Sequence, residues 1–182
     1  LRGTPVLIKA RATGNIPESL NLTIWPEGQK ALRLNMEPEG DGRFAYRMAA
    51  AQSSFSYQAH SGRAVSPIYS IRVVDPPDLG RLKLTLIPPD YTRLPKEVKE
   101  GGNIEALKGT VVNLEALTSK LIKEGKIILN QGNQLILNVD ATRLVGSMVV
   151  FYPGTYSIHV KDELGFENPN PAQYRINLIP DK

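Results

Sequence analysis

Histidine is the side chain best suited to acid–base chemistry near neutral pH, and the chain contains only two, His60 and His159. Each lies on or beside the next-to-last predicted strand of its own half of the chain, so we expect the two rings in different domains. A zinc site needs several nitrogen, sulfur or carboxylate ligands around one ion. The sequence therefore predicts no metal-binding residues, and we expect each histidine on the surface or at a strand edge.

A serine nucleophile needs a base held against its hydroxyl group. Ser157 lies two residues before His159 in a predicted strand, and side chains at positions i and i+2 point to the same face without a turn that brings them together. No Gly-x-Ser-x-Gly turn occurs. Carboxylates such as Glu97, Glu100 and Glu105 alternate with lysines, which is typical of a solvated face. The sequence thus predicts no catalytic residues and no enzyme activity.

Cysteine is absent, which excludes a disulfide framework, a cysteine-ligated zinc site and an iron–sulfur cluster. The sequence also lacks the glycine-rich loops that bind nucleotide phosphates. Asp75, Asp78 and Asp90 flank the middle of the chain, where calcium stiffens some tandem domains. Calcium needs about 6–8 oxygen ligands, and these three acids are too widely spaced to supply them. We therefore predict no cofactor.

The net charge of +4 arises from 22 Lys and Arg against 18 Asp and Glu, and the basic residues are scattered singly. Nucleic-acid faces carry clustered basic residues with interleaved aromatics, so we expect no nucleic-acid partner. No apolar run approaches the roughly 18 residues of a membrane-spanning helix, so we expect no membrane insertion of these residues. Because the chain begins at Leu1 without Met or a signal peptide, we expect it to be a piece of a longer polypeptide.

Short alternating segments bounded by Gly, Pro, Asn or Asp fill the sequence and predict β-strands. The expected strands of the first half are 5–12, 20–25, 31–36, 43–49, 55–60 and 69–74. Those of the second half are 81–87, 126–130, 134–139, 143–152, 155–160 and 174–179. Residues 114–123 fit either a helix or a strand by spacing, and their match to the first half favours a strand.

The strand pattern of the first half recurs in the second: residues 4–10 are echoed by 110–116, 54–57 by 155–158, and 69–74 by 174–179. Such a repeat of alternating segments predicts an all-β fold with two tandem immunoglobulin-like β-sandwich domains. Pro76 and Pro77 remove backbone donors and end the sheet ladder. We therefore expect domains at residues 1–75 and 79–182, joined by a stiff proline-rich linker at residues 76–78.

Gly154 and Tyr156 precede an alternating strand that ends in a turn at residues 162–165. This order resembles the penultimate strand of immunoglobulin-like sandwiches, in which an early tyrosine hydroxyl bonds back to the preceding corner. The resemblance implies such a bond for Tyr156. Phe55 stands at the equivalent position of the first half, so packing alone must hold any corner there.

Two segments carry a further resemblance. One combines PPDYTRLP at residues 88–95 with GGNIEALKGT at 101–110, and the other runs from DELG at 162–165 through NPNP at 168–171 to YRI at 174–176. Together they resemble the tandem immunoglobulin-like region of large, membrane-anchored, largely uncharacterised bacterial envelope proteins, over most of residues 65–182 and more weakly over the first half. The resemblance implies a periplasmic location, a membrane-anchored parent protein and no catalytic residues.

These observations lead us to expect a non-catalytic module, a spacer or protein-interaction segment of a larger bacterial envelope protein. Its partner would be another protein or a component of the cell envelope, and exposed edge strands would offer it backbone groups for pairing. The alternative is a carbohydrate-binding module with aromatic side chains on one face, although aromatic rings also dominate sandwich cores. The candidate aromatics are Trp25, Tyr46, Tyr57, Tyr69, Tyr91, Tyr152, Tyr156 and Tyr174.

Overall fold

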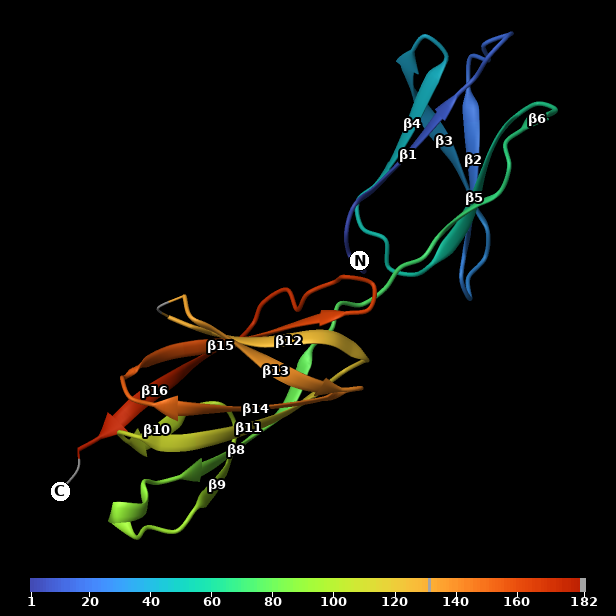
Figure 1. The fold of residues 1–182 in the computed structure, drawn as a ribbon. Coiled ribbons are helices and arrows are strands. Elements are labelled where there is room, and N and C mark those ends of the chain that lie inside the picture. The colour runs from blue at the N-terminus through green and yellow to red at the C-terminus, as the bar shows by residue number, and fades with distance from the viewer. Residues whose placement is uncertain (131, 181–182) are drawn as a thin grey trace. The chain divides into compact units, whose positions relative to one another are not determined.

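Strands dominate the computed structural model, which describes residues 1–130 and 132–180. The one helical segment among these residues is the 3-10 turn η1 (Asp90–Thr92). Within the same residues, no helix has the length and apolar character needed to span a membrane. Contacts divide the chain into two compact units, Leu1–Asp75 and Pro76–Lys182 (Figure 1).

The first unit is a small sandwich in which one strand passes between the two layers. β3 pairs with β2 through residues 32–36 and with β4 through residues 37–40. β1 lies against β4, and β5 lies against the other edge of β2, all antiparallel. The strands are β1 (Val6–Arg11), β2 (Leu20–Pro26), β3 (Leu32–Gly40), β4 (Arg43–Met48), β5 (Phe55–Ser61), β6 (Ala64–Val65) and β7 (Tyr69–Ile71).

The second unit is built in the same way around β13, which pairs with β12 through residues 134–137 and with β14 through residues 138–140. In Figure 1 the green β8 and β9 extend the layer that contains β11 and β14. β10 runs parallel to β16. The strands are β8 (Leu79–Ile87), β9 (Glu97–Glu100), β10 (Ile104–Leu107), β11 (Thr110–Thr118), β12 (Ile122–Leu129), β13 (Gln134–Asp140), β14 (Arg143–Val150), β15 (Gly154–Asp162) and β16 (Gln173–Ile179).

The two units share one set of strand neighbours. The pairs β1–β4, β4–β3, β3–β2, β2–β5 and β5–β7 of the first unit have counterparts in β11–β14, β14–β13, β13–β12, β12–β15 and β15–β16. The second unit adds β8 beside β11, β9 beside β8, and β10 beside β16. The chain is therefore all-β, with two tandem immunoglobulin-like β-sandwiches, as the sequence predicts.

Alternation along each strand places apolar side chains in a core of its own for each unit. On β15, Tyr156, Ile158 and Val160 are each 1% exposed, whereas Ser157 and His159 lie on the outer face. The buried residues of the first core are Ile8, Leu20, Leu22, Ile24, Met36, Phe44, Ala51, Phe55 and Ala59. The second core is larger and includes Leu84, Ile104, Leu114, Ile127, Leu144 and Ile176.

Several expected elements differ in extent from the observed ones. Residues 114–123 are strand, as favoured, but they belong to the end of β11 and the start of β12, with a turn between them. The strand expected at residues 69–74 ends at Ile71. β9 and β10 are not predicted from the sequence, because a segment of four residues is too short to show a clear alternating pattern. Each is identified as a strand mainly by its hydrogen-bonded pairing with another strand. The pattern of β10 alone does not reveal that its partner is β16, near the end of the chain.

Candidate functional site

The two histidines lie in different units, and each bonds to a hydroxyl group on the outer face of its sheet. His60 Nε2 lies 3.1 Å from Thr23 Oγ1, and His159 Nε2 lies 3.0 Å from Ser157 Oγ. The expectation that Ser157 and His159 do not converge is therefore wrong. Both side chains point to the same face of β15, and Ser157 Oγ and His159 Nε2 lie within hydrogen-bonding distance without any turn of the backbone.

The Ser157–His159 pair has the contact distance of a nucleophile and its base, but its surroundings are those of a sheet surface. β15 lies between β12 and β16, and Ser157 is in register with Ile128 on one side and Gln173 on the other. Its neighbouring backbone amides are used in the ladder and do not form an oxyanion site.

Beside His159 lies a surface groove of about 530 Å³ on β12, β13 and β15. Lys126 is in register with His159 across the sheet, and Lys161 pairs with Glu167 at 3.2 Å. Ile136, at 89% exposure the most exposed apolar residue on this face, forms part of the wall. The groove exposes charged side-chain ends and the apolar Ile136 to solvent, and among the described residues that line it there is no Phe, Tyr or Trp.

The glycine-rich segment at residues 101–103 is bound to β15 and β16. The Tyr156 hydroxyl donates to the carbonyl oxygen of Gly102, and Asn103 Oδ1 accepts a bond of 2.9 Å from the backbone amide of Arg175. The ring of Tyr174 covers Gly102 so closely that an added Cβ would lie 2.2 Å from Tyr174 Cδ1. Burial raises the pKa of the Tyr156 hydroxyl, which therefore stays a donor.

The corner bond expected for Tyr156 is therefore wrong in its partner. The hydroxyl bonds to a residue 54 positions earlier rather than to the corner immediately before β15. The physical reason is β10, which begins two residues after Gly102 and is held beside β16. The part of the resemblance motif that contains Gly102 and Asn103 thus has a structural role in this unit.

The second motif contains a buried polar cluster at the end of β15. The Asp162 carboxylate accepts bonds from Lys120 Nζ at 2.8 Å, from the amide of Phe166 at 2.8 Å and from the amide of Leu164 at 3.0 Å. Its side chain is 3% exposed, and that of Lys120 is 31% exposed. The cluster therefore lies just beneath the surface.

Burial raises the pKa of Asp162, but the bond from Lys120 and the two amides outweigh burial, so the pKa lies below its ordinary value. Next to this carboxylate, the Asn168 side chain accepts from the amide of Val160 at 2.9 Å and donates to the carbonyl oxygen of Ile158 at 3.0 Å. Asp162 and Asn168 thus shape the turn after β15. From the sequence, this segment is predicted as a turn at residues 162–165 and carries part of the resemblance, but neither signal indicates that Asp162 is buried or that it binds Lys120.

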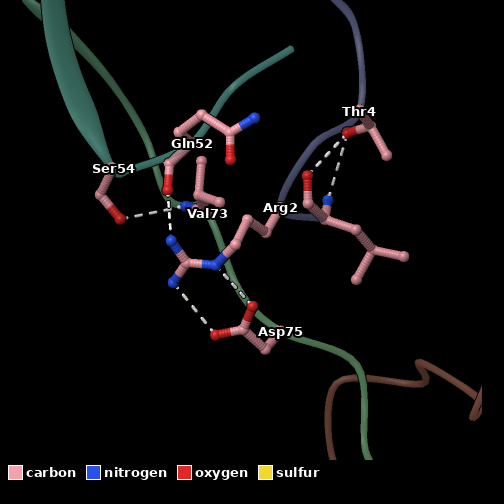
Figure 2. A network of polar contacts seen from close by, with 7 residues as sticks. Arg2, Thr4, Gln52, Ser54, Val73 and Asp75 are labelled. Atoms are coloured by element: carbon pink, nitrogen blue, oxygen red, sulfur yellow. Dashed lines mark hydrogen bonds and ion pairs between the residues drawn. The ribbon is translucent and has the colours of Figure 1, made fainter.

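Asp75, one of the acids considered for calcium, is bound by arginine (Figure 2). Both of its oxygens accept bonds from Arg2, at 2.7 Å and 3.1 Å, and the same guanidinium donates to the carbonyl oxygen of Gln52. Asp78 accepts a bond from the amide of Leu79 within its own unit. Over residues 1–130 and 132–180, no group of three or more His, Cys, Asp or Glu side chains is placed to hold a metal ion.

The aromatic residues do not share one face. Trp25 is 38% exposed and lies in register with Ser56, on the outer face of β2 and β5. A shallow groove of about 360 Å³ joins Trp25 to Glu27, Ser70 and Arg72. Tyr57 and Tyr69 stack on each other with ring centroids 5.6 Å apart, but they alternate with Ser56 and Ser70 and so lie on the opposite face. Tyr156 and Tyr174 pack against each other in the second unit, while Tyr91 and Tyr152 are exposed.

No family model and no curated protein matches the chain. Among solved structures, the chain is similar to the fibronectin(III)-like modules of Clostridium thermocellum CbhA, with a TM-score of 0.40 and 13% sequence identity, over 97% of this chain and 86% of that chain. The strand pairings themselves define the class: this is a protein of tandem immunoglobulin-like modules.

Proposed function

We propose that the chain is a non-catalytic, extracytoplasmic module that acts as a spacer or protein-interaction segment of a larger, membrane-anchored bacterial envelope protein. One observation supports the proposal. The polar side chains of the resemblance motifs form hydrogen bonds with backbone groups and with Lys120; these residues are Asn103, Asp162 and Asn168. Fixed in this way, they maintain a turn and a strand junction. Such residues support the shape of a module rather than a reaction.

The open strand edges support the interaction part of this proposal. β1 ends one sheet order of the first unit, and β9 ends that of the second. β9 carries Glu97, Lys99 and Glu100, which is the charged pattern that discourages edge pairing. β1 is charged at only two of its six positions, Lys9 and Arg11, against three of four in β9, and it is therefore the edge better suited to a partner strand.

The spacer part is tested through the linker prolines. Because the chain has no cysteine, spin labels can be attached at Gln29→Cys and Glu163→Cys alone. Electron–electron distance measurements should give one narrow distribution, since proline fixes φ at two successive positions. Replacing Pro76 and Pro77 with glycine should widen that distribution at least twofold. An equally broad distribution in both chains would contradict the spacer function.

A carbohydrate-binding function is the second candidate, favoured by the groove that joins Trp25 to Glu27 and Arg72. One partly exposed indole with neighbouring charged groups can stack on a sugar ring and bind its hydroxyls. On a glycan and peptidoglycan panel we expect no signal from the unaltered chain. A signal that Trp25→Ala abolishes and Tyr69→Ala leaves intact would replace the proposed function with sugar binding, because Tyr69 lies on the opposite face.

A further inference from the structure

The two units differ at one edge of their shared pattern. In the second unit β8 lies antiparallel along β11, and three inward side chains of β11 face leucines: Val112 is in register with Leu86, Leu114 with Leu84 and Ala116 with Leu82. β1 is the counterpart of β11 because both pair with the matching strand, β4 or β14. Among the residues of the first unit, all of which the structure describes, no strand takes the place of β8.

Burial shows what that difference does to the core. Val112 and Ala116 are 0% exposed in the second unit. Their counterparts Val6 and Ala10 are only partly buried, although both pack against the first core. Ile8 lies between them and is only 3% exposed, so the inward face of β1 retains apolar surface for a further strand to cover at Val6 and Ala10. Burying apolar surface is favourable.

The backbone of β1 is also available on that side. Ala12 donates to the carbonyl oxygen of Gly42 on the β4 side. In an antiparallel ladder, successive residues direct their amides to opposite neighbours. Even-numbered residues of β1 therefore bond to β4, whereas the amides of Leu7, Lys9 and Arg11 face the open edge.

A groove continues from this edge. It has a volume of about 350 Å³ and is lined by Ala10 and Ala12 together with Leu20, Ala59 and Val65. Apolar side chains of a strand laid along β1 would enter it.

The charged residues on the outer face of β1 determine which charge a partner strand should carry opposite them. In the second unit Glu115 forms its ion pair with Arg143 at 2.9 Å, and it is also in register with Lys83 of β8, so opposite charges face each other across these two strands. The counterpart of Glu115 in β1 is Lys9, so the sign is reversed. Neither Lys9 nor Arg11 forms an ion pair within the described residues, while the neighbouring Arg47 is already bound by Glu37 and Glu39.

From these observations we propose that β1 is a docking edge for an extended segment of another polypeptide. The segment adds antiparallel to β1, places apolar side chains at alternate positions on the core side and a carboxylate opposite Lys9. This inference rests on the interaction part of the proposed function and names its surface. A second copy of this chain pairing through its own β1 is disfavoured, because antiparallel β1–β1 pairing centred on Lys9 would set two lysines opposite each other.

The test uses the full 182-residue chain and a labelled synthetic peptide with the sequence of Leu79–Ile87 carrying Lys83→Glu. Fluorescence anisotropy should show binding, and amide exchange should slow at Leu7, Lys9 and Arg11. The peptide with the natural Lys83 should bind about fivefold more weakly, since a favourable cross-strand pair becomes a like-charge pair.

Two variants of the chain complete the design. Lys9→Glu should reverse the preference between the two peptides. Lys9→Pro should abolish binding of both, because it removes one amide on the open side and none on the β4 side. Circular dichroism establishes that each variant is folded, and if Lys9→Pro does not fold, the Lys9→Glu reversal decides.

Absence of binding, or binding that both Lys9 variants leave unchanged, would overturn the assignment of this edge. So would concentration-dependent self-association without peptide that Lys9→Glu alters, since the occupant would then be a second copy. A negative result with a narrow distance distribution across the linker leaves the spacer function standing and removes only the docking edge.

Discussion

Replacing Gly102 with alanine is expected to lower the free energy of unfolding of the second unit by about 2–3 kcal/mol. The added Cβ would lie 2.2–2.5 Å from three atoms of the Tyr174 ring, far inside van der Waals contact. The ring cannot move away easily, because it packs against Tyr156 with centroids 5.3 Å apart. The same shift would disturb the carbonyl oxygen of Gly102 that the Tyr156 hydroxyl binds. Urea denaturation followed by far-ultraviolet circular dichroism measures the loss.

Gly146→Ala is the matched control for this prediction. Its added Cβ would come equally close, 2.3 Å, but to Cδ2 at the tip of the Leu137 side chain. The end of a leucine side chain can change rotamer more easily than a tyrosine ring that lies against both Gly102 and Tyr156, so the loss of stability should be clearly smaller. The double variant with Gly102→Ala and Tyr174→Ala should have nearly the same free energy of unfolding as Tyr174→Ala alone. Equal effects of Gly102→Ala and Gly146→Ala would contradict the packing that we describe.

Replacing Asp162 with asparagine is expected to cost about 2–4 kcal/mol at neutral pH. The carboxylate accepts from Lys120 and from the amides of Leu164 and Phe166. An amide side chain cannot satisfy all three donors, because its nitrogen is itself a donor. The ammonium group of Lys120 would also lose its negative partner.

The effect of Asp162 depends on pH in a definite direction. Its pKa in the folded chain is lower than the ordinary value of 3.8 that applies to the unfolded chain. The unfolded state therefore takes up a proton first as the pH falls, and the stabilising contribution is present above pH 3.8. It is lost as the pH falls from there through the lower pKa of the folded state. The difference in unfolding free energy between the unaltered chain and Asp162→Asn should shrink over this range.

Glu163→Gln serves as the control for charge, because Glu163 is exposed in the turn next to Asp162. It should change stability by less than about 0.5 kcal/mol. If Asp162→Asn and Glu163→Gln had equal effects, or if the effect of Asp162→Asn grew as the pH fell below 3.8, the role of this carboxylate would be refuted.

Patterns within single strands were readable from the sequence. Leu20, Leu22 and Ile24 alternate with polar residues, and β2 buries all three. Alternation predicts strands because the two faces of a strand meet different surroundings. It also explains why the predicted class of fold is correct, since two sets of such strands leave few other ways to bury their apolar faces.

Contacts between distant strands were not readable in the same way. The bond from Tyr156 to Gly102 depends on β10 lying beside β16, and the contact between Ser157 and His159 depends on the rotamers of two side chains. Neither property has a periodic signature. The short parallel pair is set by the packing of the whole second unit rather than by the four residues of β10.

The amino-acid sequence by itself determined that this protein is made of strands and that its second half follows the plan of its first, because alternation and turn residues act over a few positions. Only the tertiary structure decided which polar residues hold the fold and which edge lacks a neighbour. Those properties belong to pairs of strands far apart in the chain, where β8 covers β11 and β1 retains its open side.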